Sequence, residues 1–274
     1  MQLCKMQIGG RSVSGFATGI TLPHMGILLD CGQANAQARQ CPMVLLTHAH
    51  LDHFGGIIRH AYIRYMTKMS PSIFVVPDHM VEMVHEQFRF WAKAQKTRVI
   101  DYKVLVAKPG EILRLDKQKY IRSFRTIHRI PSQGYVIGET RKKLKSEYQG
   151  LEGPELGALR SKGVQVHKTV DVPLIAFTGD TQASVFDTLG AKEALQAKVL
   201  ITECTFIDEE VSLKEAHRKG HVHLDELVSR EGLFQNEAIL LAHFSHRYGN
   251  KDVERAIEKM PPKMRAKTHY LPVN

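Results

Sequence analysis

The sequence lacks the cysteine spacing of a zinc ribbon or of a disulfide-stabilised secreted domain. Its four cysteines, Cys4, Cys31, Cys41 and Cys204, are scattered and form no CxxC pair. Both kinds of structure depend on regularly spaced cysteines. We therefore expect buried or half-buried free thiols.

Long hydrophobic runs are also missing. No stretch approaches the ~20 apolar residues that a membrane-spanning helix needs. The opening residues, MQLCKMQIGG, alternate as in a strand and do not resemble a signal peptide. We expect a soluble, cytoplasmic protein with no membrane partner.

Acidic residues are outnumbered, with 28 Asp and Glu against 38 Lys and Arg, so the formal net charge is +10. Such an excess favours a polyanionic partner, because clustered cations release counterions from phosphates, although a solvated basic surface is the alternative. The 274 residues, 43% of them hydrophobic, suffice for one substantial core. We expect a single domain over residues 1–274.

Short apolar, β-branched runs alternate with stretches of helical spacing. Several of these runs are apolar throughout, as expected for strands covered on both faces. This pattern indicates a layered α/β fold with two sheets packed together and helices outside. The predicted strands are 26–30, 43–48, 72–77, 102–107, 120–128, 172–180, 198–203 and 238–244, and the predicted helices are 78–95, 213–220, 224–234 and 251–260.

One segment, residues 138–163, breaks the pattern because it is polar, basic and contains glycine. We interpret it as a short insertion on the core, either a flexible loop or a small protruding module. If it binds RNA, its cations would contact phosphates; otherwise they form an ordinary solvated charge run. These cations are Arg141, Lys142, Lys143 and Lys145.

The segment THAHLDH places His48, His50, Asp52 and His53 within six positions directly after a predicted strand. The spacing fits neither the i, i+4 pattern of helical zinc sites nor the alternation of a strand. We therefore place the cluster on a strand-to-helix connection. Four ligands there can serve two adjacent metal ions.

Three further candidate ligands, His128, Asp180 and His243, each follow an apolar strand, so sheet architecture would bring them to one edge. Taken alone, His128 could be a core or surface histidine and Asp180 a helix cap. Nitrogen and oxygen ligands without thiolate suit Zn²⁺, with Mn²⁺ or Fe²⁺ as alternatives. Two such ions roughly 3.5–4 Å apart can bridge a hydroxide and a phosphoryl oxygen.

These motifs together resemble the metallo-β-lactamase superfamily and specifically its ribonuclease Z family. THAHLDH is followed in order by His128, TGDT (178–181) and AHFSHRY (242–248), while ITECTF (201–206) and KGHVH (219–223) resemble that family's later motifs. Residues 128–151 resemble its short plant-type branch. The resemblance spans nearly the whole chain and implies an αββα sandwich of two mixed β-sheets flanked by helices.

The resemblance also implies an activity, the zinc-dependent removal of 3′ trailers from precursor tRNA by an endoribonuclease. The alternative is a metallo-hydrolase of the same fold that acts on small phosphodiesters, for which the basic surface would be unnecessary. A metal-free RNA-binding scaffold is disfavoured, because every expected ligand position is filled.

Site roles follow from the resemblance. One zinc ion would be held by His48, His50 and His128, the other by Asp52, His53 and His243, with Asp180 bridging them. Asp52 would also take the nucleophile's proton. His221, oriented by Glu203, would donate a proton to the leaving ribose oxygen, which is reasonable because a carboxylate favours the imidazolium form. Without the resemblance, His221 would be interpreted as a helix-surface residue.

Two residues outside this set have expected roles. Arg247 could clamp a phosphate, with a structural ion pair as the alternative. Asp30 should accept a hydrogen bond from the far nitrogen of a ligand histidine. The resemblance further implies a homodimer, and we expect apolar residues of helices 54–66 or 79–95 at the contact.

Overall fold

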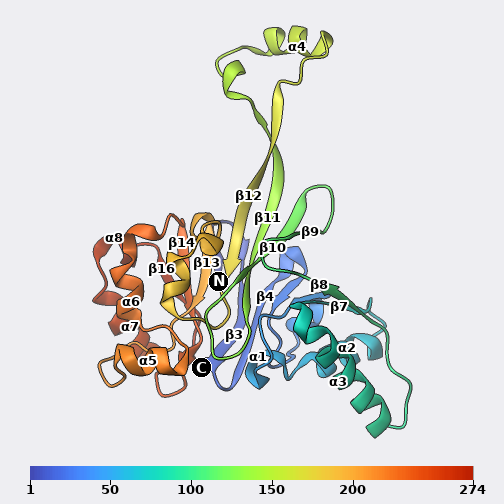
Figure 1. Cartoon of the computed structure of the whole chain (residues 1–274), viewed down its shortest axis with the longest axis vertical. Helices are drawn as coiled ribbons and strands as arrows, with labels where there is room; N and C mark the ends of the chain where they lie inside the picture. The colour runs from blue at the N-terminus through green and yellow to red at the C-terminus, as the bar shows by residue number, and fades with distance from the viewer. Residues whose placement is uncertain (274) are drawn as a thin grey trace.

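The computed structural model describes residues 1–273, and two seven-stranded sheets form its centre (Figure 1). In spatial order the first sheet contains β15 (Phe244–Ser245), β3 (Gly9–Ser14), β4 (Ala17–Leu22), β5 (Ile27–Leu29), β6 (Met43–Leu45), β7 (Ser72–Val76) and β8 (Tyr102–Val106). The second contains β16 (Thr268–Tyr270), β14 (Ala238–Ala242), β13 (Val199–Glu203), β12 (His167–Phe177), β11 (Gln133–Leu144), β10 (Lys119–Arg125) and β9 (Ile112–Arg114). Both sheets are mixed. A separate hairpin joins β1 (Gln2–Leu3) to β2 (Met6–Gln7).

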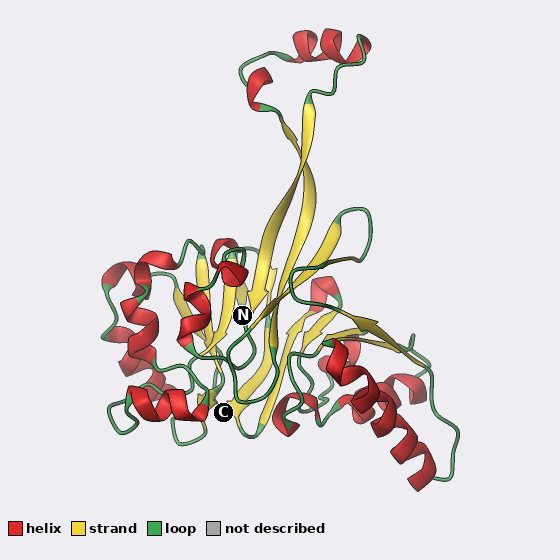
Figure 2. Cartoon of the chain, viewed as in Figure 1, coloured by secondary structure: helices red, strands yellow, loops and turns green. Residues whose placement is uncertain are grey.

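Helices cover the outer face of each sheet (Figure 2). The first sheet is flanked by α1 (Leu51–Phe54), α2 (Ile57–Met66) and α3 (Val81–Ala94), and the second by α5 (Leu213–Lys219), α6 (Leu224–Ser229), α7 (Asn250–Glu258) and α8 (Pro262–Arg265). The predicted αββα sandwich is therefore confirmed.

Alternate residues of one strand serve different layers of the core. Ile27 and Leu29 of β5 belong to the apolar cluster between the sheets, whereas Leu28 packs in the cluster that contains Ile57 of α2 and Phe88 of α3. All three β5 side chains are buried. A strand covered on both faces has no polar side to alternate with, which explains the continuous apolar runs.

The polar insertion forms a long antiparallel arm that projects from the second sheet (Figure 1). Residues 139–144 of β11 pair with residues 167–172 of β12, and α4 (Gly153–Ser161) lies at the tip. The predicted boundaries, 138–163, end too early, because the returning strand begins at His167 rather than near residue 172. The segment is thus a protruding module made of a two-stranded ribbon and a tip helix, not a flexible loop.

The arm leaves the sheet at an irregularity in the ladder. The register between β11 and β12 shifts between Ile137 and Gly138, where Gly138 faces Pro173. A Cβ atom on Gly138 would lie only 2.4 Å from the ring of Tyr120, so glycine is required for this packing. Register shifts of this kind bend strands and increase their twist.

The cysteines are unpaired, as predicted, with Cys4 half-buried and the other three buried. Within residues 1–273, no helix combines the length and apolar character needed to cross a membrane.

Candidate metal centre

The THAHLDH segment connects β6 to the outer layer of helices. His48 and His50 lie on the connecting loop, whereas Asp52 and His53 lie in the four-residue helix α1. The predicted strand-to-helix connection is therefore present. His53 is buried and His50 is half-buried, so the segment turns its polar side chains into the protein.

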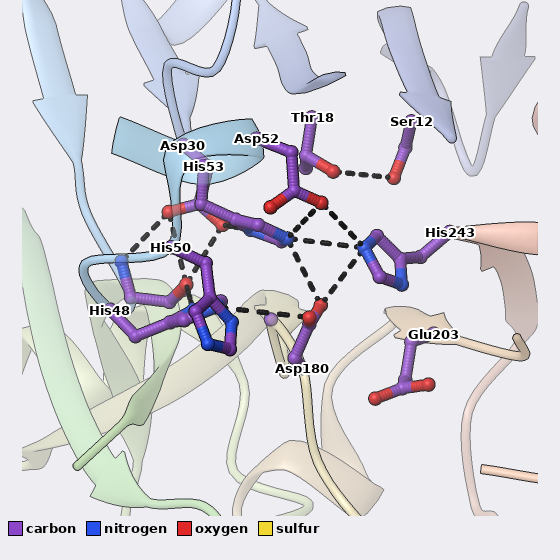
Figure 3. Close-up of polar contacts among 12 residues, drawn as sticks. Ser12, Thr18, Asp30, His48, His50, Asp52, His53, Asp180, Glu203 and His243 are labelled. Carbon is purple, nitrogen blue, oxygen red and sulfur yellow. Dashed lines mark hydrogen bonds and ion pairs between the residues drawn. The ribbon is translucent and has the colours of Figure 1, made fainter. Parts of the chain in front are cut away.

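The structure brings all seven predicted ligands together at one edge of the sandwich, and Figure 3 labels all of them except His128. They form two groups in which the potential ligand atoms lie within 4.8 Å of one another, the first containing His48, His50, His128 and Asp180, and the second Asp52, His53 and His243. In the first group, Nδ1 of His50 lies 3.0 Å from Nε2 of His48 and 3.2 Å from Nε2 of His128. In the second, the Nε2 atoms of His53 and His243 are 3.1 Å apart.

Asp180 lies between the two groups. Its Oδ2 atom is 3.7 Å from Nε2 of His48, and its Oδ1 atom is 3.2 Å from Nε2 of His53 and 3.4 Å from Nε2 of His243. The side chain is 2% exposed, yet Oδ1 has no hydrogen-bond partner. A buried carboxylate oxygen without a partner is costly, and a cation would satisfy it. The residues present therefore fit two metal ions that share this carboxylate.

The protonation states also favour metal binding by the first group. Burial, reinforced by the nearby His53, lowers the pKa of His48 to about 2. Burial likewise lowers the pKa of His50 and of His128. Neutral imidazoles offer a nitrogen lone pair, which is the form that binds metal. Although burial opposes ionisation of Asp180, the adjacent His243 and His53 hold its pKa well below the usual value.

Asp30 contacts the second group through the nitrogen of His53 that faces away from the other ligands. Its Oδ2 atom lies 2.7 Å from Nδ1 of His53, and the Thr47 amide donates a 2.7 Å hydrogen bond to Oδ1. The expected contact between Asp30 and the far nitrogen of a candidate ligand histidine is confirmed. Such a contact fixes the ring and directs its other nitrogen toward the site.

The backbone around the site is held in unusual conformations. Asp30 and His243 have φ values of 56° and 61°, which non-glycine residues rarely adopt. Each such residue costs on the order of 1–3 kcal/mol and persists only where its surroundings enforce it. Gly32 packs against α1, where a Cβ atom would lie 1.8 Å from the Asp52 carbonyl oxygen. Any larger residue at position 32 would displace the helix that carries Asp52 and His53.

Glu203 and His221 form a pair beside this centre. Nδ1 of His221 lies 3.1 and 3.2 Å from the two carboxylate oxygens of Glu203, at the end of β13, and 3.9 Å from Oδ2 of Asp180. Amides of Thr181 and Val222 donate to the same carboxylate at 2.6 and 3.0 Å. Burial disfavours the imidazolium form, but the charge and hydrogen bond of Glu203 outweigh it and raise the pKa of His221 to about 9. The contact with Glu203 therefore favours the imidazolium form of His221.

Three residues that contact the centre were not predicted. Thr205 donates to Oε2 of Glu203 at 2.7 Å and lies 3.2 Å from Nδ1 of His243, so it links the two. The Gly220 carbonyl lies 2.8 Å from Nδ1 of His128, and the Gly15 amide donates to Oδ2 of Asp52 at 2.8 Å. The position of Thr205, two residues after Glu203 in ITECTF, could have indicated a shared strand face. The other two contacts involve only backbone atoms of the glycines and leave no signal in residue type.

Arg247 is exposed, and its guanidinium contacts acidic and aromatic neighbours. Its guanidinium lies 2.7 Å from Asp208 and 3.5 Å from Glu210, and it donates a hydrogen bond to the Tyr248 hydroxyl. The structural ion pair, the alternative for this residue, is therefore present, and contact with a phosphate stays a prediction. The ion pair forms because the loop after β13 brings two carboxylates within reach.

The four predicted RNA-contacting cations lie on or next to β11 in the arm. Arg141, Lys142 and Lys143 are exposed, while Lys145 is half-buried. Arg141 pairs with Glu139, and Lys145 lies 3.7 Å from Glu147. The arm carries three further exposed cations that were not predicted to contact RNA, namely Arg160, Lys162 and Lys168.

Comparisons with known proteins agree with this geometry. No protein-family model matches the chain. It is 36% identical over 272 residues to tRNase Z TRZ1 of Arabidopsis thaliana, an alignment that covers 99% of this chain and 96% of that protein. Among solved structures, the metallo-β-lactamase fold protein YhfI of Bacillus subtilis superposes with a TM-score of 0.63 at 17% identity, covering 97% of this chain and 95% of that one.

Human tRNase Z, short form, superposes with a TM-score of 0.61 at 18% identity, covering 96% of this chain and 93% of that one. The two structural similarities establish the metallo-β-lactamase fold. The sequence identity, which extends over almost the full length of both proteins, establishes the family: this chain belongs to the tRNase Z family.

Proposed function

We propose that this protein is a zinc-dependent endoribonuclease that removes 3′ trailers from precursor tRNA. The observation that carries the proposal is the buried Asp180 carboxylate between two groups of histidine and aspartate ligands, in a chain of the tRNase Z family. The metal ions, when bound, would supply an activated water and neutralise charge on the phosphoryl group.

The proposed ligand assignment follows the two groups. His48, His50 and His128 would hold one zinc ion, and Asp52, His53 and His243 would hold the other. Asp180 would contribute to both. Nitrogen and oxygen ligands also suit manganese and iron(II), which are the alternatives to the proposed zinc.

Protein side chains would handle the protons. Asp52 would accept a proton from the attacking water while its Oδ2 atom stays oriented by the Gly15 amide. His221, cationic and held by Glu203, would donate a proton to the departing O3′ atom as the P–O3′ bond breaks. The products would be a tRNA with a 3′-hydroxyl and a trailer with a 5′-phosphate.

The arm would dock the RNA away from the centre. It projects from the body and carries Arg141, Lys142, Lys143 and Lys145. Phosphate contacts position a nucleic acid without reading its sequence, which suits a substrate class that shares one overall shape.

We also propose that two copies of the chain associate through α2 and α3. Large apolar side chains are rarely gathered on the surface of a monomeric protein without a partner. On these two helices the exposed large apolar residues are Tyr62, Tyr65, Met66, Met83, Phe90 and Trp91. Sedimentation of the wild type and of Phe90→Glu would test this proposal, which predicts a dimer and a monomer respectively.

The activity is tested with an end-labelled precursor tRNA that carries a 3′ trailer, incubated with zinc or manganese beside the His50→Ala variant. We expect a single metal-dependent cut near the end of the acceptor stem, absent in the variant. Absence of cleavage together with hydrolysis of bis(p-nitrophenyl) phosphate would overturn the substrate and leave a small-phosphodiester hydrolase.

A further inference from the structure

The turn between β3 and β4 exposes an aromatic side chain beside the metal centre. Phe16 is 61% exposed, although an aromatic ring of this size ordinarily contributes to a core or an interface. β3 pairs with β15 through Val13 with Phe244 and Ser14 with Ser245. His246 directly follows Ser245, and Phe16 lies two residues after Ser14. The pairing of β3 with β15 therefore brings the rings of Phe16 and His246 together.

Phe16 and His246 are in contact. Their ring centroids lie 5.1 Å apart, with the ring planes tilted by 49°, and His246 is exposed as well. The tilt leaves the pair open as a surface instead of closing it as a stacked sandwich. Together the two rings form an accessible aromatic surface.

This surface is tied to the centre on both sides. Gly15, adjacent to Phe16, donates its amide hydrogen to Oδ2 of Asp52 at 2.8 Å. His246 lies three residues after His243, whose Nε2 atom is 3.5 Å from the same Asp52 oxygen. Figure 3 shows Asp52 and His243 facing each other at this part of the site. Phe16 is therefore one residue, and His246 three residues, from a residue that contacts Asp52 at the proposed reaction centre.

We propose that Phe16, supported by His246, forms a stacking subsite for the nucleobase next to the scissile phosphate. This inference rests on the proposed ribonuclease function. Unpaired bases of single-stranded RNA stack on aromatic side chains regardless of base identity, as expected for a subsite that must accept different sequences. The subsite would set the position of the phosphate relative to the metal ions, while the arm sets the position of the tRNA as a whole.

The test is a substrate series in which the base on the 5′ side or the 3′ side of the cut is removed to leave an abasic nucleotide. Cleavage is measured at subsaturating substrate for the wild type, Phe16→Ala and Phe16→Trp. We expect Phe16→Ala to lose about 5- to 100-fold on the intact substrate, the usual range for one base–aromatic stack. On the substrate that lacks the stacked base, the same variant should match the wild type, and Phe16→Trp should restore cleavage of the intact substrate.

A matched control is Leu189→Ala, which removes another exposed apolar side chain, 92% exposed, from a different loop. It should cleave all substrates as the wild type does. Metal content and melting temperature of Phe16→Ala should equal those of the wild type, which separates loss of the subsite from loss of the fold. Equal cleavage by Phe16→Ala and the wild type, or the same fold loss on both abasic substrates, would overturn the subsite.

The two proposals can fail separately. A 2-aminopurine base placed on either side of the cut reports stacking by fluorescence quenching on mixing, before cleavage. Normal cleavage by the wild type with no quenching that depends on Phe16 overturns the subsite alone. Failure of the wild type to cleave any precursor tRNA overturns the proposed function, on which the subsite depends.

Discussion

Nδ1 of His53 lies 2.7 Å from Oδ2 of Asp30, and both side chains are fully buried. The contact fixes the His53 ring so that its Nε2 atom faces Asp180 and His243. Burial opposes protonation of His53, but Asp180 and Asp30 raise its pKa well above the usual value. A metal ion at Nε2 would replace one of the two ring protons while Asp30 keeps the other.

Asp30→Asn should therefore weaken metal binding. Replacing a carboxylate behind a ligand histidine typically costs 10–100-fold in affinity, and we expect a loss in this range, measured by competition with a chromogenic chelator. Asp78→Asn, at a carboxylate whose side chain is 71% exposed, is the matched control and should bind metal as the wild type does. Unchanged affinity in Asp30→Asn would remove this residue from the metal site.

His221→Ala should separate metal binding from catalysis. Because His221 is proposed as the proton donor and not as a ligand, the variant should retain its metal content while cleavage slows by on the order of 10²–10⁴. Metal content is measured by atomic emission and cleavage under single-turnover conditions. A loss of metal in proportion to activity would instead indicate that His221 is a ligand.

Glu203→Gln should shift the pH dependence of cleavage. The proton donor is active while protonated, so the rate should fall as pH rises through the pKa of His221, which Glu203 raises to about 9. Removing the carboxylate charge lowers that pKa, and the alkaline fall in rate should move to lower pH. An alkaline limb at the same pH in both proteins would exclude His221 as its origin.

Replacing Arg141, Lys142, Lys143 and Lys145 together with alanine should weaken RNA binding. With fewer phosphate contacts, RNA binding releases fewer counterions. KM for precursor tRNA should therefore rise and its salt dependence should flatten, with a smaller change in kcat. Replacing Lys251, Lys259, Lys263 and Arg265 on the far side of the second sheet removes the same charge and is the control. Equal effects of the two variants would show that only net charge matters.

His60 should make the protein less stable in mild acid. The ring is fully buried, with Nε2 lying 3.2 Å from the Ala38 carbonyl oxygen and 3.1 Å from that of Cys41. Burial lowers its pKa to about 4, below the value near 6.5 of an unfolded histidine. The unfolded state therefore binds the proton first, and stability is lost as pH falls from about 6.5 to about 4.

Between pH 7.5 and 5 this group should remove about 2 kcal/mol from the free energy of unfolding. In His60→Gln, which keeps an amide donor but does not titrate, that part of the loss should disappear. Urea unfolding of both proteins in the presence of a chelator measures the difference. Parallel pH profiles would assign the acid sensitivity to other groups.

Eight of the fourteen strands in the two sheets and the ligand cluster could be predicted because each leaves a local signal, whereas β3, β4, β9, β11, β15 and β16 were not predicted. Leu28 and its neighbours in β5 are apolar on both faces, and His48, His50, Asp52 and His53 follow a strand at once. The arm left no such signal, because most residues of 139–144 and 167–172 lie partly or fully in solvent and have no apolar face. The sequence offered an ion pair of Arg247 as an alternative but could not identify its partner, since Asp208 comes from a loop 39 residues earlier.

Within residues 1–273, no third strand pairs with residues 140–144 or 167–171, which lie beyond the register shift at Gly138 in the ladder between β11 and β12. Because successive residues of a strand face opposite sides, the lengths of these two strands set the direction in which the tip helix α4 lies. Adding one residue to each strand turns the tip helix α4 to the opposite side, whereas adding two to each restores its direction. The reach of this protein can therefore evolve in steps of two residue pairs, with the body and its catalytic edge left untouched.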